Sequence, residues 1–199
     1  MRNTAIIVFI YVILLFGNEG SSETQSFRKG VLAHMGGDYA TALLEWGPLA
    51  KSGKADAQFN LGVMYEKGRG IRQNYITAAK WYKLAAKQGH LYAKNNLGLL
   101  YSKGLGVSQN YKDALELYKS AAEQGFSEAQ VNLAVLYAKG LGVIQDCVYA
   151  YMWLNISATQ GNASAARMNE VIIKIMTSSQ ISEAQKLARK CILKNYKSC

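Results

Sequence analysis

Short glycine-containing segments are the first candidates for chemistry in this sequence. Gly68-Arg69-Gly70 and its two later counterparts superficially resemble the loops that bind phosphate through backbone N–H groups. Such phosphate loops follow a strand, whereas these segments follow helical patterns and occur three times. Helix termination explains both glycines of each segment, so we predict no nucleotide site.

Histidine and acidic residues do not form a recognisable catalytic or metal centre. The only two histidines, His34 and His90, have no cysteine, glutamate or second histidine at a ligand spacing. No Gly-x-Ser-x-Gly or Ser-x-x-Lys motif marks a nucleophile, and aspartate and glutamate are sparse and dispersed. We therefore predict a protein that is not an enzyme and that carries no metal and no cofactor.

Three cysteines offer a different kind of chemistry. Cys147, Cys191 and Cys199 include no Cys-x-x-Cys pair, so neither a zinc site nor a thioredoxin-like motif is supported. In an oxidising compartment Cys191 and Cys199 could join the last helix to its tail, if the tail brings the two Cα atoms within about 7 Å. The odd number of cysteines leaves one thiol over, and three unpaired cysteines explain the sequence about as well.

One recurring set of polar residues is suited to binding rather than catalysis. The repeated pairs are Asn60 with Lys67, Asn96 with Lys103, and Asn132 with Lys139. Seven residues return a helix to nearly the same face, so each pair lies on one stripe. A ladder of amides can donate to and accept from the backbone of an extended peptide. Alternatively, each asparagine bonds to a neighbouring hairpin or caps a backbone group, and packing is the simpler explanation of a threefold recurrence.

These residues recur because one unit is repeated without gaps. Leu61, Leu97 and Leu133 are each separated by 36 residues, and the surrounding residues repeat with them. Self-similarity at this period indicates stacked repeat units rather than one compact enzyme core. Within a unit, Ala57, Leu61 and Tyr65 form a helical stripe, Gly68 suits the left-handed end of that helix, and a second helix follows. The predicted N-caps of this second helix in the three repeats are Asn74, Asn110 and Asp146.

The patterns Asn-Leu-Gly-x-x-Tyr-x-x-Gly-x-Gly-Val/Ile and Trp-Tyr-x-x-Ala-Ala-x-x-Gly resemble the Sel-one-like repeat (SLR) family, a relative of the tetratricopeptide repeat. The resemblance covers Ala55 to Asn162. It implies an all-α, right-handed solenoid of stacked antiparallel helical hairpins, with the first helices lining the concave face. Three departures from the pattern should change packing only locally: Leu117 for tryptophan, Ala134 for glycine and Leu154 for tyrosine.

The remaining segments complete the predicted organisation. We divide the chain into a leader (1–20), a degenerate N-terminal hairpin (21–54), three repeats (55–90, 91–126 and 127–162) and a C-terminal helical cap (163–199). The first helix is expected from about residue 26 to 35, followed by Asp38 as an N-cap. The C-terminal cap should contain a helix over 163–176 and another from a capping box at Thr177 to about Cys191, with residues 194–199 frayed.

The leader joins a short basic start to an apolar run from Thr4 to Phe16. This run is short for a membrane span and is typical of a secretory signal. We expect cleavage near Ser21 to Glu23 and a periplasmic or secreted protein, with an inner-membrane anchor at residues 4–16 as the alternative.

Charge and resemblance together suggest the class of partner. The formal net charge of +10 favours acidic partners, including a cell-wall polymer, lipid head groups or acidic proteins. The lysines are scattered and no nucleic-acid-binding motif is present, so we predict no nucleic-acid role. The resemblance implies a non-catalytic adaptor that binds a protein or peptide in the bacterial envelope or outside the cell. The alternatives are an enzyme related to the cell wall or to β-lactams, and a secreted effector that engages host proteins.

Overall fold

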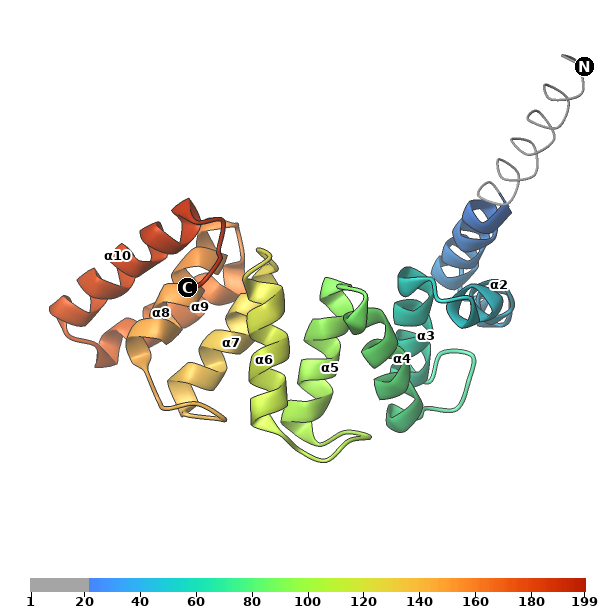
Figure 1. Cartoon of the computed structure of the whole chain (residues 1–199), viewed down its shortest axis with the longest axis horizontal. Helices are drawn as coiled ribbons and strands as arrows, with labels where there is room; N and C mark the ends of the chain where they lie inside the picture. Colours follow the sequence, from blue (N-terminus) through green and yellow to red (C-terminus); the bar gives the residue numbers. More distant parts are fainter. Residues whose placement is uncertain (1–21) are drawn as a thin grey trace, which may run out of the picture.

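A computed structural model describes residues 22–199, and this part of the chain consists of helices, turns and loops without a strand. The first helix covers residues 22–35, and the elements after it are α2 (Tyr39–Lys51), α3 (Ala55–Lys67), α4 (Tyr75–Lys87), α5 (Leu91–Lys103), α6 (Tyr111–Ala122), α7 (Ser127–Lys139), α8 (Cys147–Thr159), α9 (Ala163–Ile172), the 3₁₀ helix η1 (Ile173–Ile175) and α10 (Ser178–Leu193). Figure 1 shows them following one another along the molecule, and each helix from α2 to α8 packs against the next. The prediction of an α-solenoid built from helical hairpins is confirmed, and the repeated hairpins are α3–α4, α5–α6 and α7–α8.

Differences from the predicted helix boundaries are confined to the two ends. The chain is already helical at residue 22, and the helix predicted over 163–176 gives way to η1 after Ile172. The predicted leader lies outside the described residues. Within residues 22–199, no helix is both long enough and apolar enough to cross a membrane.

Capping determines where the repeated helices begin and end, as the sequence predicted. Each first helix ends at a glycine in the left-handed region, with φ between 66° and 68°, at Gly68, Gly104 and Gly140. Each second helix begins after a side chain that accepts hydrogen bonds from first-turn N–H groups, at Asn74, Asn110 and Asp146. Thr177 and Gln180 form the predicted capping box of α10. These contacts satisfy backbone groups that a helix leaves unpaired at its ends.

Inside the first two repeats, a glycine on the first helix lets the backbone approach an aromatic ring on the second helix. A Cβ added to Gly62 would lie 2.5 Å from the ring of Tyr82, and one added to Gly98 would lie 2.7 Å from the ring of Tyr118. Carbon atoms in a packed interior do not come this close, so the rings require glycine opposite them. The corresponding pair in the N-terminal hairpin is Gly30 and Trp46.

The third repeat keeps a filled interior with a different pair. Ala134 occupies the glycine position and Leu154 the tyrosine position, and both are buried in one core cluster. A leucine has no flat ring to collide with a Cβ, so a methyl group is accommodated where the other hairpins require glycine. Two departures that look independent in the sequence are thus one compensated change.

The ring hydroxyl also has a matched partner in the hairpins that carry it. The Tyr82 hydroxyl donates to Glu66 Oε2 at 2.6 Å, and the side chain of Ser102 acts on the Tyr118 hydroxyl, whose pKa it lowers against the larger rise caused by burial. Glu66 and Ser102 occupy equivalent positions, and the third repeat has Ala138 there. Where the hydroxyl is lost, its partner is lost too.

The second glycine of each loop sets the distance between successive hairpins. A Cβ at this glycine would collide with the start of the second helix of the preceding hairpin; the pairs are Gly70 with Tyr39, Gly106 with Tyr75, and Gly142 with Tyr111. At Gly142 the added Cβ would lie 2.6 Å from the carbonyl carbon of Tyr111. Assigning both loop glycines to helix termination was therefore wrong for the second one, which is a contact between hairpins.

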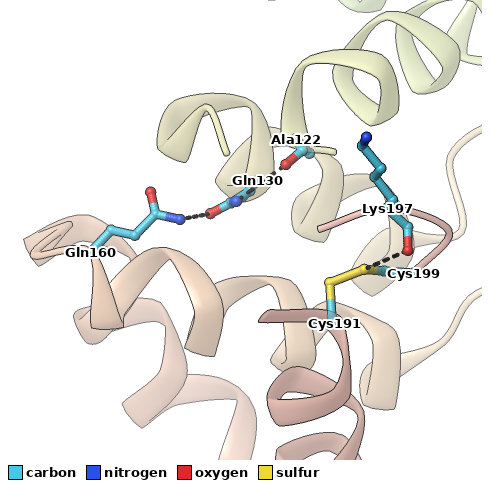
Figure 2. Close-up of a disulfide and its surroundings, with 6 residues drawn as sticks. All are labelled: Ala122, Gln130, Gln160, Cys191, Lys197 and Cys199. Carbon is cyan, nitrogen blue, oxygen red and sulfur yellow. Dashed lines mark hydrogen bonds between the residues drawn. A yellow bond between two sulfur atoms is a disulfide. The ribbon is translucent and has the colours of Figure 1, made fainter. Parts of the chain in front are cut away.

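A glutamine relay adds a polar link between hairpins. Gln130 Nε2 donates to the carbonyl oxygen of Ala122 at 3.3 Å, and its Oε1 accepts from Gln160 Nε2 at 3.3 Å (Figure 2). The same relay in the first repeat runs from Gln88 through Gln58 to the carbonyl of Ala50. Each relay satisfies the buried glutamine that forms its centre.

The C-terminal tail folds back on α10. Cys191 and Cys199 form a disulfide with their Cα atoms 5.4 Å apart, as Figure 2 shows, while Cys147 is free. The N–H of Tyr196 donates to the carbonyl of Cys191 at 2.9 Å, and the Tyr196 ring lies beside Gly125 at the end of the second repeat. The expectation of a frayed tail is wrong, because the disulfide and this ring hold residues 194–199 in a series of turns.

The fit between Gly98 and Tyr118 predicts that two harmful substitutions compensate each other. Gly98→Ala alone places a methyl group against the ring, and we expect a loss of about 1–3 kcal/mol of unfolding free energy from overpacking. Tyr118→Leu alone should leave a cavity and also destabilise the protein. The double variant copies the third repeat, so urea unfolding should show a favourable coupling of about 0.5–3 kcal/mol.

Gly36→Ala is the matched control, because the backbone of Gly36 lies outside the left-handed region and a Cβ there would make only an ordinary contact, 3.4 Å from the carbonyl oxygen of Leu32. This change should alter the free energy of unfolding by less than about 0.5 kcal/mol. Strictly additive effects of the Gly98 and Tyr118 substitutions would contradict the proposed fit.

Candidate interaction surface

The three repeated asparagines lie at equivalent positions of α3, α5 and α7, where each is half-buried. Asn96 Nδ2 donates to the hydroxyl of Tyr82, at 3.2 Å, in the preceding hairpin. That hydroxyl in turn donates to the buried Glu66. Asn96 thus ties the second repeat to the first.

A second asparagine, Asn95, extends this connection to the third repeat. Asn95 Nδ2 donates to Asn96 Oδ1 at 3.4 Å, and Asn95 Oδ1 accepts from Asn132 Nδ2 at 2.8 Å. A continuous row of hydrogen bonds, the asparagine row, therefore runs from Glu66 through Tyr82, Asn96 and Asn95 to Asn132 across all three repeats. The sequence analysis missed Asn95 because the equivalent residues are Phe59 and Val131, so this position does not recur.

The amides retain some capacity for an external ligand. Asn132 uses one N–H in this row, which leaves its second N–H and its carbonyl oxygen, since an amide offers two donors and an acceptor. Within the described part of the chain, the side chain of Asn60 makes no hydrogen bond. Bonding between hairpins and contact with a peptide are therefore compatible on this stripe.

The three lysines that follow the asparagines are exposed. Lys67 Nζ lies 2.7 Å from Glu66 Oε1 and helps to balance that buried carboxylate. Lys103 and Lys139 form no ion pair with any residue between 22 and 199. Two positive charges of this set are therefore available to a partner.

Three aromatic side chains, Phe59, Tyr92 and Phe126, form an aromatic row along the same repeats as the asparagines. The ring centroids of Phe59 and Tyr92 lie 5.8 Å apart, and those of Tyr92 and Phe126 lie 4.7 Å apart in an edge-on arrangement. Tyr92 remains 56 % exposed, although it contacts both neighbours. His90 stacks on Phe59 and its Nδ1 accepts from the N–H of Ala93, so this histidine has a capping role. The row was not predicted, because each repeat contributes a different ring.

Titratable groups near the repeated asparagines have structural roles. Burial, together with the bond to Glu66, raises the pKa of Tyr82 far above its usual range, and burial raises the pKa of Tyr118 to about 12. Both phenols remain protonated at neutral pH and act as hydrogen-bonding groups rather than bases. Burial lowers the pKa of His90, partly opposed by Asp56, whose Oδ1 lies 3.2 Å from Nε2. In residues 22–199 no group of three or more His, Cys, Asp or Glu residues is placed to hold a metal ion.

A family model of the Sel1 repeat matches residues 55–90, 91–126 and 127–162, which together make up more than half of the chain. The chain belongs to the Sel1 repeat family. Sel1 repeats are helical scaffolds that generally mediate protein–protein interactions. The asparagine row and the aromatic row both lie within the matched repeats.

Two solved structures support the same assignment. The Sel1 repeat protein from Oxalobacter formigenes is 26% identical and has a TM-score of 0.69, with 81% of this chain and 74% of that chain covered. The protein c5321, a protective antigen present in uropathogenic Escherichia coli strains and displaying an SLR fold, is 26% identical with a TM-score of 0.59. That match covers 92% of this chain and 49% of c5321, so this chain spans about half the length of c5321. Among curated proteins, none matches the sequence.

The asparagine row predicts that Asn96 and Asn60 differ in their effect on the stability of the Sel1 stack. Asn96→Ala removes the donor to Tyr82 and the acceptor for Asn95, so unfolding free energy should fall by about 0.5–1.5 kcal/mol for each lost bond. Asn60→Ala removes no such bond and should change stability by less than about 0.5 kcal/mol. Thermal unfolding of the two variants side by side measures the difference. Equal melting temperatures would show that the row contributes nothing to stacking.

Proposed function

We propose that the protein is a non-catalytic scaffold that binds a protein or peptide through the face where α3, α5 and α7 present the aromatic row. The observation that carries this proposal is Tyr92, which is 56 % exposed yet held between Phe59 and Phe126. Rigid aromatic side chains bury a large area at little cost in conformational entropy, and they dominate many protein interfaces. An exposed ring that contacts a second ring on either side is therefore a suitable anchor for a partner.

The polar residues beside the row suggest how a partner would be aligned. Asn60, Asn96 and Asn132 offer amide groups next to the rings, and their remaining capacity suits the backbone of an extended peptide. Lys103 and Lys139 add positive charge at the other end of α5 and α7, whereas Lys67 at the end of α3 is paired with Glu66. With the net charge of +10, this arrangement favours a partner that carries acidic residues.

We place this interaction in the bacterial envelope or outside the cell. The secretory pattern of the leader supports this placement. The disulfide between Cys191 and Cys199 supports it independently, because structural disulfides persist in oxidising compartments.

Site-specific photo-crosslinking in intact cells tests this proposal. A photoreactive phenylalanine analogue at position 92 should capture a discrete partner, because it replaces one ring with another at the proposed anchor. Asn60→Ala leaves the hydrogen bonds between hairpins intact and should remove one hydrogen bond to the partner. The crosslink yield should then fall by up to roughly tenfold. The partner should be recovered from the envelope fraction or the medium.

The same analogue at position 44 provides the control, because Leu44 is 72 % exposed on α2 and lies outside the matched repeats. Position 44 should give no partner-sized product. Identical products from both positions, or none from position 92, would contradict binding on this face. Recovery of the partner only from cytoplasm would contradict the proposed compartment.

A further inference from the structure

A groove with a volume of about 370 Å³ lies between α4 and α6, the second helices of the first and second repeats. Its floor includes Leu97 and Tyr101 from α5, and Leu117 from α6 lies along one side. This volume falls in the range of about 300–1,000 Å³ that is usual for ligand sites. The groove opens between second helices and is distinct from the aromatic row, whose rings come from α3 and the beginnings of α5 and α7.

The origin of the groove is a missing indole. Position 117 is equivalent to Trp81 in the first repeat and to Trp153 in the third. Trp81 packs against the cluster that contains Ala50 and Leu61. The counterparts of these two residues one repeat further along the chain, Ala86 and Leu97, line the groove. Trp153 is only 2 % exposed and belongs to one cluster with the corresponding residues of α6 and α7. The protein thus inserts its own indole at this location in two repeats and leaves the location open, with a leucine, in the middle one.

The two walls of the groove carry opposite charges. Lys83 and Lys87 stand on α4, and Asp113 and Glu116 stand on α6. None of these four side chains forms an ion pair within residues 22–199. A partner with a carboxylate on the α4 side and an amine or guanidinium on the α6 side would complement both walls.

We propose that this groove binds a tryptophan side chain of a partner polypeptide, flanked by an acidic residue toward α4 and a basic residue toward α6. The indole takes the place that Trp81 and Trp153 fill in the neighbouring repeats, and the flanking charges orient the segment. This inference rests on the proposed scaffold function and names one chemical feature of the partner. It makes the middle repeat, where Leu117 replaces the tryptophan of the other two repeats, the position of a specificity pocket.

Methyl NMR of the full mature chain tests the groove with a defined probe, the peptide Ac-Glu-Gly-Trp-Gly-Lys-NH2. Saturable shifts should occur at the methyl groups of Leu97 and Leu117, which line the groove. The same peptide with alanine in place of tryptophan should bind at least tenfold more weakly. Replacing its glutamate and lysine by glutamine should weaken binding roughly two- to fivefold, as expected for exposed ion pairs.

Leu117→Trp is the decisive variant, because it restores the residue present in the other two repeats. It should fold, gain or keep thermal stability, and reduce peptide affinity at least tenfold. Trp81→Leu is its counterpart and should open a second groove between α2 and α4, adding a binding event to a chain that keeps the first. If Leu117→Trp fails to fold, the alanine peptide and the Lys83→Glu change still test the groove on a folded chain.

Each alternative occupant gives a distinct result that overturns the proposal. Equal affinity for N-acetyltryptophanamide and the charged peptide would indicate a small aromatic ligand instead of a polypeptide. Self-association that Leu117→Trp abolishes would indicate a second copy of the chain. Unchanged peptide binding in Leu117→Trp would place the indole elsewhere. Tyr92→Ala should leave peptide affinity in the groove unchanged, so failure of the groove and failure of the proposed face are distinguishable.

Discussion

Contact between the backbones of successive hairpins is the constraint on which this stack depends. Each glycine loop reaches the start of the second helix in the preceding hairpin, and at Gly106 a single added carbon would overlap the backbone of Tyr75. At Gly106 and Gly142 no side chain separates the two segments, so each of these loops must reach the same place on the preceding hairpin. A constant unit of 36 residues follows from that requirement, since an insertion would displace the loop from its contact.

Other parts of the repeat vary where a second change restores the fit. Glycine pairs with a ring in the N-terminal hairpin and in the first two repeats, while Ala134 pairs with Leu154 in the third. Leu117 is a departure of another kind, because no neighbouring side chain fills the space of the absent indole and a groove results. Compensated changes preserve the solenoid, whereas an uncompensated one creates a place for a ligand. This distinction connects the packing of the Sel1 repeats with the proposed recognition of a partner.

The sequence predicted those features that follow from local rules or from periodicity. Helix caps such as Asn74, the left-handed Gly68 and the stacking of hairpins all belong to this class. The sequence-based predictions were wrong or silent for residues that act on a neighbouring hairpin, including the recurrent Gly106 and several residues at positions that do not recur. Asn95, Tyr92 and the anchored Tyr196 are examples, because their partners lie far along the chain and their types differ from repeat to repeat. Asn60, Asn96 and Asn132 lie at equivalent positions of α3, α5 and α7, but only the contacts of Asn96 and Asn132 reveal that these asparagines also link hairpins.

Gly106 couples successive hairpins, and a comparison with Gly104 tests this coupling most directly. Both glycines have φ of 68°, so an alanine at either position loses the same amount of free energy by adopting a left-handed backbone. A Cβ at Gly104 would lie 3.3 Å from Gln109 Cβ in its own loop, whereas one at Gly106 would enter the preceding hairpin. The measurement is urea unfolding of Gly104→Ala and Gly106→Ala. We predict that Gly106→Ala loses more free energy, by about 1–3 kcal/mol, and that its unfolding becomes less cooperative. Equal losses with a single unchanged transition would contradict the account.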